Sequence, residues 1–155
     1  MSFQIHSLPH DDYAPLFVLS DEDLESQGAK RMTVNACPGT PCRISMQDAR
    51  IGESVILLNY QHQPEASPYQ ASHAIFVREG ARPAELAPGD VPEVIRSRLI
   101  SVRLFDEDHM MVDADVVDGI DVAQAIETAF KDPGIRYIHL HNAKPGCFAA
   151  KVTRA

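Results

Sequence analysis

The amino-acid sequence predicts an α+β fold, a single domain over residues 1–155 with a mostly antiparallel sheet of seven to nine strands and two or three short helices. Three observations lead to this prediction. A chain of 155 residues that is 45% hydrophobic suits one buried core. Short strand-like runs recur through the chain, and most connections between them are of hairpin length. Near the C-terminus a longer segment has helical periodicity, and we expect this helix to pack on one face of the sheet.

The first half of the chain is predicted to hold one helix and several strands. Residues 3–8 alternate between apolar and polar side chains, which is typical of a strand. Ser20 precedes three acidic residues, so we expect it to cap a helix over residues 21–27 that ends at Gly28. The other expected strands cover residues 31–36, 43–46, 55–60 and 74–78, with a double turn at 37–42. Residues 55–60 lack alternation, which predicts a strand covered on both faces.

The second half is predicted to form two hairpins around the C-terminal helix. Residues 99–105 and 109–117 flank an acidic turn, and residues 135–142 and 147–153 flank a Pro-Gly turn. The helix is expected to begin at Asp121, with Gln124 as its capping-box partner, and to end at 132–134. Its apolar stripe consists of Val122, Ile126, Ala129 and Phe130.

Charge and hydropathy exclude several classes of partner. The net charge is −8, and residues 106–132 contain nine acidic residues against one base, which disfavours nucleic acid as a partner. No apolar run approaches the length of a membrane span, and the N-terminus lacks the pattern of a signal peptide. We therefore expect a cytoplasmic protein with reduced thiols that binds neither membranes nor nucleic acid. The sequence does not indicate a cofactor or an oligomeric state.

A pair of histidines near the C-terminus is the first candidate for chemistry. His139 and His141 are two residues apart on a predicted strand, so both point to one face together with Ile135 and Tyr137. A metal site there would use His139, His141 and Cys147, completed by His62, His73, Cys37 or Cys42. Because structural zinc sites normally contain closely paired cysteines, which this chain lacks, we expect no metal and a hydrogen-bonded histidine pair instead.

Other motifs give weaker signals or none. Cys37 and Cys42 flank prolines, where a reversible disulfide is conceivable, but we expect both to serve packing. Asp113 to Gly119 does not match the spacing of a calcium-binding loop, and we expect Asp113 and Asp115 to be solvated, with Arg103 as a cross-strand neighbour. The chain contains no phosphate-binding loop, dinucleotide fingerprint, zinc-protease motif or serine-hydrolase motif.

The segment between two predicted core strands, residues 61–73, is the second candidate site. Thirteen residues exceed hairpin length, and loops of this length in compact domains are usually functional or disordered. The segment has one charged residue but three glutamines and several hydroxyl groups, so we expect it to be ordered. His62, Tyr69 and His73 are predicted to line a pocket for a small polar ligand, shared with His139 or His141. The alternative is a loop whose side chains satisfy its own backbone.

Several runs resemble a known family. They are Pro-Gly-Thr-Pro-Cys-Arg (38–43), Leu-Leu-Asn-Tyr-Gln-His-Gln-Pro (57–64), Ser-Pro-Tyr (67–69), Ser-His-Ala-Ile-Phe-Val-Arg-Glu (72–79) and Ile-His-Leu-His-Asn-Ala-Lys-Pro-Gly-Cys (138–147). Together they resemble the family catalogued as domain of unknown function 1203, over nearly the whole chain. The resemblance implies a bacterial protein with a single domain, and it implies no particular activity, cofactor or catalytic residue.

Two functions from different classes are consistent with these residues. The favoured one is a non-catalytic domain that binds a small molecule or a partner. The alternative is an enzyme that uses the histidine and cysteine side chains, with or without a metal ion. A stoichiometric metal ion in the purified protein would favour the enzyme over the binding domain.

Overall fold

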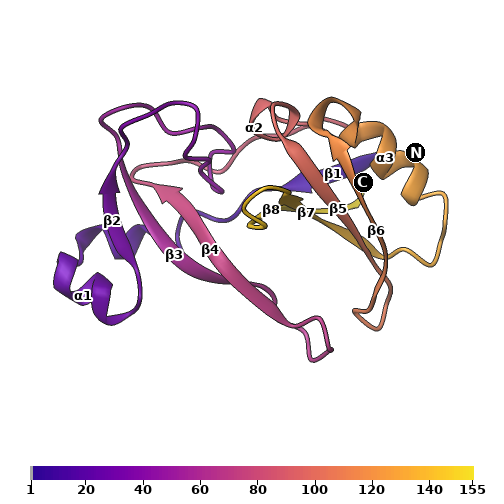
Figure 1. Ribbon diagram of the computed structural model, residues 1–155, viewed down its shortest axis with the longest axis horizontal. Helices are drawn as coiled ribbons and strands as arrows, with labels where there is room; N and C mark the ends of the chain where they lie inside the picture. The colour runs from indigo at the N-terminus through magenta and orange to yellow at the C-terminus, as the bar shows by residue number, and fades with distance from the viewer. Residues whose placement is uncertain (1) are drawn as a thin grey trace. The chain divides into compact units, whose positions relative to one another are not determined.

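The computed structural model describes residues 2–155, which form eight strands and three α-helices in an α+β arrangement with two antiparallel sheets (Figure 1). The strands are β1 (Phe3–His6), β2 (Lys30–Thr33), β3 (Ser54–Gln63), β4 (Ala71–Arg78), β5 (Leu99–Phe105), β6 (Met111–Asp118), β7 (Tyr137–Asn142) and β8 (Phe148–Arg154). The helices are α1 (Asp21–Ser26), α2 (Glu93–Arg96) and α3 (Val122–Ala129), and short 3-10 helices lie at Ala14–Val18 and Gly119–Asp121. This confirms the predicted fold class.

Contacts divide the chain into two compact units. The first contains residues 2–6, 61–72 and 85–155, and the second contains residues 7–60 and 73–84. The eight strands fall within the predicted number, but they are split between a five-stranded sheet and a three-stranded sheet. No helix within residues 2–155 is both long and apolar enough to span a membrane.

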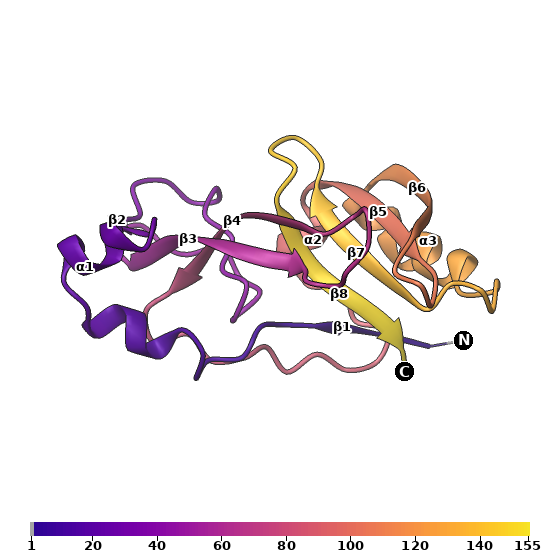
Figure 2. The ribbon, with the colours of Figure 1, turned by 90° about the horizontal axis from the view of Figure 1, so that it is seen from below.

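The five-stranded sheet belongs to the first unit and has the order β1-β8-β7-β5-β6, with every neighbouring pair antiparallel. The two predicted hairpins, β5–β6 and β7–β8, are both present, and β8 lies between β1 and β7 (Figure 2). In the β5–β7 register Val102 is opposite Leu140 and Arg103 is opposite His139. Because successive side chains of a strand point to opposite faces, this register decides which residues share a face.

One face of this sheet is apolar and is covered by α3, and we call it the α3 face. It consists of Ile100 and Val102 on β5, Ile138 and Leu140 on β7, and Val152 on β8. The helix contributes Val122 and Ile126, which are completely buried, as the helical stripe predicted. The predicted capping box does not form, since the Asp121 side chain makes no capping hydrogen bond.

The second unit contains most of the three-stranded sheet, whose order is β2-β3-β4, while residues 61–63 of β3 and 71–72 of β4 belong to the first unit. Its core gathers Ile56 on β3, Ile75 and Val77 on β4, and Leu24 on α1. Helix α1 begins as predicted, because the Ser20 hydroxyl accepts a hydrogen bond from the Asp23 amide at 3.1 Å. The prediction that residues 55–60 are covered on both faces holds only for Val55 and Ile56.

Two predicted segments are wrong. Residues 43–46 form a turn rather than a strand, because Met46 adopts a left-handed backbone conformation with φ 55°, which interrupts an extended chain. The connection predicted over residues 61–73 is shorter than expected: β3 extends to Gln63 and β4 starts at Ala71, which leaves 64–70 as the loop. Both strands continue through polar residues, so the hydrophobic pattern of the sequence did not show where they end.

Candidate metal centre

The face of the five-stranded sheet opposite α3 is polar and aromatic, and we call it the histidine face. It consists of Ser101, Arg103, Phe105, Tyr137, His139, His141, Phe148 and Lys151. His139 and His141 are only 2% and 1% exposed, and their ring centroids are 6.4 Å apart. They share this face with Tyr137, as predicted, but Ile135 does not, because β7 begins only at Tyr137 and Ile135 lies beside the α3-face residues Val102 and Leu104.

A third imidazole joins this pair. His62, near the end of β3, lies with its ring centroid 4.7 Å from that of His141 and 6.0 Å from that of His139. Its ring also stacks on Phe148 at 5.6 Å with the two planes nearly parallel, which fixes the imidazole against the sheet. One ring nitrogen from each of the three histidines lies within 4.8 Å of the others. In the sequence, His62 is 77 positions from His139 and 79 positions from His141.

A hydrogen bond fixes the tautomer of His141. Its Nδ1 lies 2.9 Å from the carbonyl oxygen of Gly146. A carbonyl can only accept, so Nδ1 must carry the proton and Nε2 presents a lone pair. A backbone carbonyl in this position is the usual orienting partner of a metal-binding histidine.

His139 carries the clearest sign of an incomplete site. Its Nδ1 is buried and has no hydrogen-bond partner among residues 2–155. A buried polar atom without a partner destabilises a fold by about 1–3 kcal/mol, so proteins rarely keep one without a use. A ligand at this nitrogen would remove that cost.

The electrostatic environment keeps His139 neutral. Burial is the main cause that lowers its pKa to about 3, and the charges of His141, His62, Lys151 and Arg103 contribute to the same shift. At neutral pH the imidazole is therefore uncharged, which is the form that coordinates metal ions.

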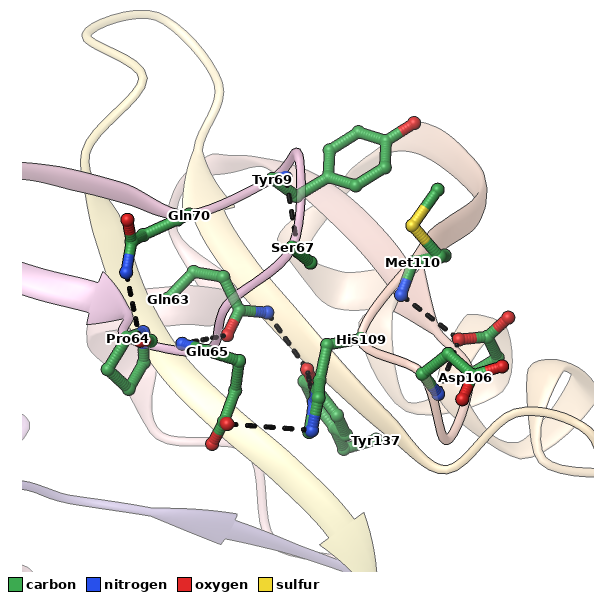
Figure 3. A network of polar contacts seen from close by, with 11 residues as sticks. Gln63, Pro64, Glu65, Ser67, Tyr69, Gln70, Asp106, His109, Met110 and Tyr137 are labelled. Carbon is green, nitrogen blue, oxygen red and sulfur yellow. Dashed lines mark hydrogen bonds and ion pairs between the residues drawn. The ribbon is translucent and has the colours of Figure 1, made fainter.

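A chain of hydrogen bonds attaches the segment that carries His62 to the sheet (Figure 3). The Gln63 Nε2 donates to the Tyr137 hydroxyl at 2.8 Å, and the same hydroxyl lies 2.8 Å from Nδ1 of His109. The other ring nitrogen of His109 is 3.6 Å from a Glu65 carboxylate oxygen. Since Gln63 directly follows His62, this network holds the end of β3 over the histidine face. None of Gln63, His109 and Glu65 was identified from the sequence as a site residue, because the network joins the end of β3 and its following loop to the distant β5–β6 turn.

The remaining predicted site residues lie outside the histidine cluster. Tyr69 is 37% exposed, with its ring edge-on to Phe105 at 6.2 Å. His73 belongs to the second unit, and its Nδ1 lies 3.0 Å from the carbonyl oxygen of Ala74. Cys147 is not one of the three clustered ligands, and its sulfur accepts a hydrogen bond from the Asn142 amide at 3.5 Å. Cys37 is exposed, Cys42 is buried, and neither forms a disulfide.

Two cations of the histidine face were not singled out as site residues. In register, His139 lies between Arg103 on β5 and Lys151 on β8. Residue alternation on three correctly paired strands would have found both. The expected contact of Arg103 with Asp113 or Asp115 is wrong, because Arg103 is opposite Ala114 and both aspartates border the groove beside α3.

Comparison with known proteins places the chain in a family. Residues 39–154 match the family described as Protein of unknown function (DUF1203), which confirms the resemblance drawn from the sequence motifs. No curated protein and no solved structure matches the chain. The function therefore has to be argued from the site itself.

Proposed function

We propose that this chain, which belongs to the DUF1203 family, binds one divalent transition-metal ion through His62, His139 and His141. The observation that carries the proposal is the clustering of three imidazoles within 4.8 Å, two of them buried. Tetrahedral zinc with bonds of about 2.0–2.1 Å places its ligand atoms roughly 3.4 Å apart. Small rotations of the three rings would bring the nitrogens to that separation.

The type of ligand indicates which ion and which kind of site. Neutral imidazoles suit zinc, copper, iron and nickel, whereas calcium and magnesium prefer oxygen ligands. Structural zinc sites are closed by four protein ligands, usually including cysteine, while catalytic sites use three and leave one position open. Within the described residues no fourth His, Cys, Asp or Glu belongs to the cluster. Three histidines alone therefore favour an open site.

An open site favours a metal-dependent enzyme over the non-catalytic binding domain. A bound ion would supply Lewis acidity to a ligand in the open position. The chain's own residues would hold the metal ligands in place. The Gly146 carbonyl fixes the His141 ring, and the Gln63–Tyr137 hydrogen bond positions the segment that carries His62. The expectation of no metal rested on the lack of closely paired cysteines, which a site of three histidines does not need.

A metal titration of untagged protein tests the proposal. We expect metal-free protein to bind one equivalent of Zn²⁺ in competition with a chromophoric chelator, and to give the visible spectrum of tetrahedral Co²⁺. His139→Ala should weaken zinc binding by at least about 100-fold, because one of three ligands is lost. His73→Ala makes the same change outside the cluster and should leave binding unchanged.

A second pair of variants separates this ligand set from the one suggested by the sequence motif. Cys147→Ser should keep the zinc affinity within about threefold, while His62→Ala should lose it like His139→Ala. Wild-type protein that binds no zinc, or a Cys147→Ser variant that loses zinc while His62→Ala retains it, would contradict the proposed centre.

A further inference from the structure

The strand register places two cations on either side of the buried histidine His139. Arg103 on β5 and Lys151 on β8 are its direct cross-strand partners. Directly opposite residues on antiparallel strands have their Cβ atoms about 4.5–5.5 Å apart and point to the same face. The Arg103 Nε donates to the Ser101 hydroxyl at 3.2 Å, and the Lys151 ammonium lies 4.6 Å from the centroid of the Tyr137 ring. Both cations therefore belong to the histidine face.

Neither cation has an acidic partner. The chain has 22 acidic residues and a net charge of −8, yet neither Arg103 nor Lys151 forms an ion pair within residues 2–155. Besides burial, the charges of Glu65 and Asp106 raise the pKa of the neighbouring Tyr137, but both carboxylates have other partners. Glu65 faces His109, and Asp106 accepts hydrogen bonds from the amides of Asp108 and Met110.

Of the two cations, Arg103 is the one that a further partner would stabilise most. Arg103 is half-buried, and burial lowers its pKa, which means that its charged form is partly deprived of water. Proteins rarely desolvate a guanidinium without a carboxylate or phosphate partner. A positive site on an otherwise acidic protein points to an anion that comes from outside the chain.

We propose that the ligand of the histidine face is an oxyanion, a carboxylate or phosphate group of a small molecule, held between Arg103 and Lys151 beside the three histidines. The planar guanidinium suits two oxygens of such a group, and the ammonium adds a second positive charge. The inference deepens the proposed metal centre, since an oxyanion is also a good ligand for an open metal position. The two cations attract the anion with or without the metal ion, so the charge pairing can be tested separately.

NMR titration of the full chain with two probes tests this inference. Inorganic phosphate and acetate are added separately to metal-free and to zinc-loaded protein at constant ionic strength, and backbone amide shifts give the affinity and its location. We expect shifts on β5, β7 and β8 in both forms. Tighter binding of phosphate would identify a phosphate-bearing ligand, and tighter binding of acetate a carboxylate.

Charge-removing variants identify the residues. Arg103→Gln and Lys151→Gln should each weaken binding of the preferred probe by roughly 10-fold or more, because each loses a charge-assisted hydrogen bond. Lys131→Gln and Arg136→Gln remove the same charges from exposed positions off the histidine face and should change affinity less than twofold. Because Lys151 is exposed, its variant is expected to fold even if Arg103→Gln does not.

The outcomes separate this inference from the proposed metal centre. The cation variants should still bind one equivalent of zinc, since neither residue is a metal ligand. Wild-type protein that binds zinc but neither probe would overturn the anion site alone, and so would anion binding unchanged in both variants. Protein that binds no zinc but binds a probe through Arg103 and Lys151 would overturn the metal centre and support the anion site.

Discussion

The two faces of the five-stranded sheet are built from the same strands, yet one face is apolar and the other is polar and aromatic. On the α3 face, Val102 is opposite Leu140, and both are buried side chains without any polar atom to satisfy. One residue further along the same strands, the histidine face pairs Arg103 with His139. Alternation thus assigns stability to one face and polar chemistry to the other.

The difference lies in what each face requires in order to be buried. Apolar side chains are stabilised by burial itself, at about 25 cal/mol per Å² removed from water. Buried histidines need a partner for each ring nitrogen, and His139 Nδ1 has none among the described residues. The apolar side chains of the α3 face therefore need no ligand, whereas we propose that a ligand completes the histidine face.

The largest expected effect comes from damaging the α3 face. Ile126 is completely buried, and Ile126→Ala should lower the free energy of unfolding by about 2–5 kcal/mol through lost burial and the cavity left behind. Urea denaturation measures this change. Val116→Ala on the exposed edge strand β6 is the control, with an expected effect within about 0.5 kcal/mol. Equal effects of the two variants would contradict the assignment of α3 as a core helix.

A smaller effect is expected from the hydroxyl that holds the His62 segment. Tyr137→Phe removes the acceptor of the buried Gln63 amide, so the free energy of unfolding should fall by about 1–3 kcal/mol. Zinc affinity should fall about 10-fold, because His62 loses its support. Gln70→Ala breaks the loop's exposed Gln70–Pro64 hydrogen bond and should leave zinc affinity unchanged. Unchanged zinc affinity in Tyr137→Phe would show that this network does not position His62.

Making the histidine face apolar should raise stability. His139→Leu replaces a buried ring that has an unsatisfied nitrogen with an apolar side chain of similar volume, so we expect the metal-free protein to gain about 1 kcal/mol. The same variant should not bind zinc. A variant that is clearly destabilised in urea, with metal removed from both proteins, would mean that the His139 ring already has all the partners it needs.

Acidification should destabilise the protein through His139, an effect that is absent at neutral pH. The folded pKa of His139, about 3, is below its unfolded value of 6.5, so the unfolded state binds more protons between these two values. Metal-free protein should therefore lose stability as pH falls from 6.5 toward 3. The positive groups around His139, namely His62, His141, Arg103 and Lys151, act in the same direction. His139→Leu should show a shallower loss, and identical pH profiles for the two proteins would refute this assignment.

Much of the first unit could be predicted from the sequence, because its patterns are local. The bounds of β5 agree with the prediction, and the apolar stripe of α3 identified Val122 and Ile126 as buried. Each of these depends on neighbouring residues along one element, where hydrophobic periodicity is a reliable signal. The ends of β3 and β4 were missed because polar residues such as Gln61 and Ser72 continue both strands.

The site was only half predictable for a physical reason. Residue alternation placed His139, His141 and Tyr137 on one face, and His62 was one of several residues expected near them, but no local pattern distinguishes His62 from His73 or the cysteines as the third member of the cluster. The same applies to Arg103 and Lys151, whose relation to His139 depends on the pairing of three strands. Tyr69 and His73 were chosen for their residue type within one loop, and neither joins the histidine cluster.

The most direct test is crystallography of protein soaked with zinc, with anomalous scattering measured at the zinc absorption edge. We expect a single strong anomalous peak about 2.0–2.1 Å from one ring nitrogen each of His62, His139 and His141, with Nε2 as the nitrogen from His141. The fourth position should be filled by water or an anion on the side of Arg103 and Lys151. A fully soaked crystal with no peak at these three rings, or with zinc held by Cys147 and other residues instead, would contradict the proposed centre.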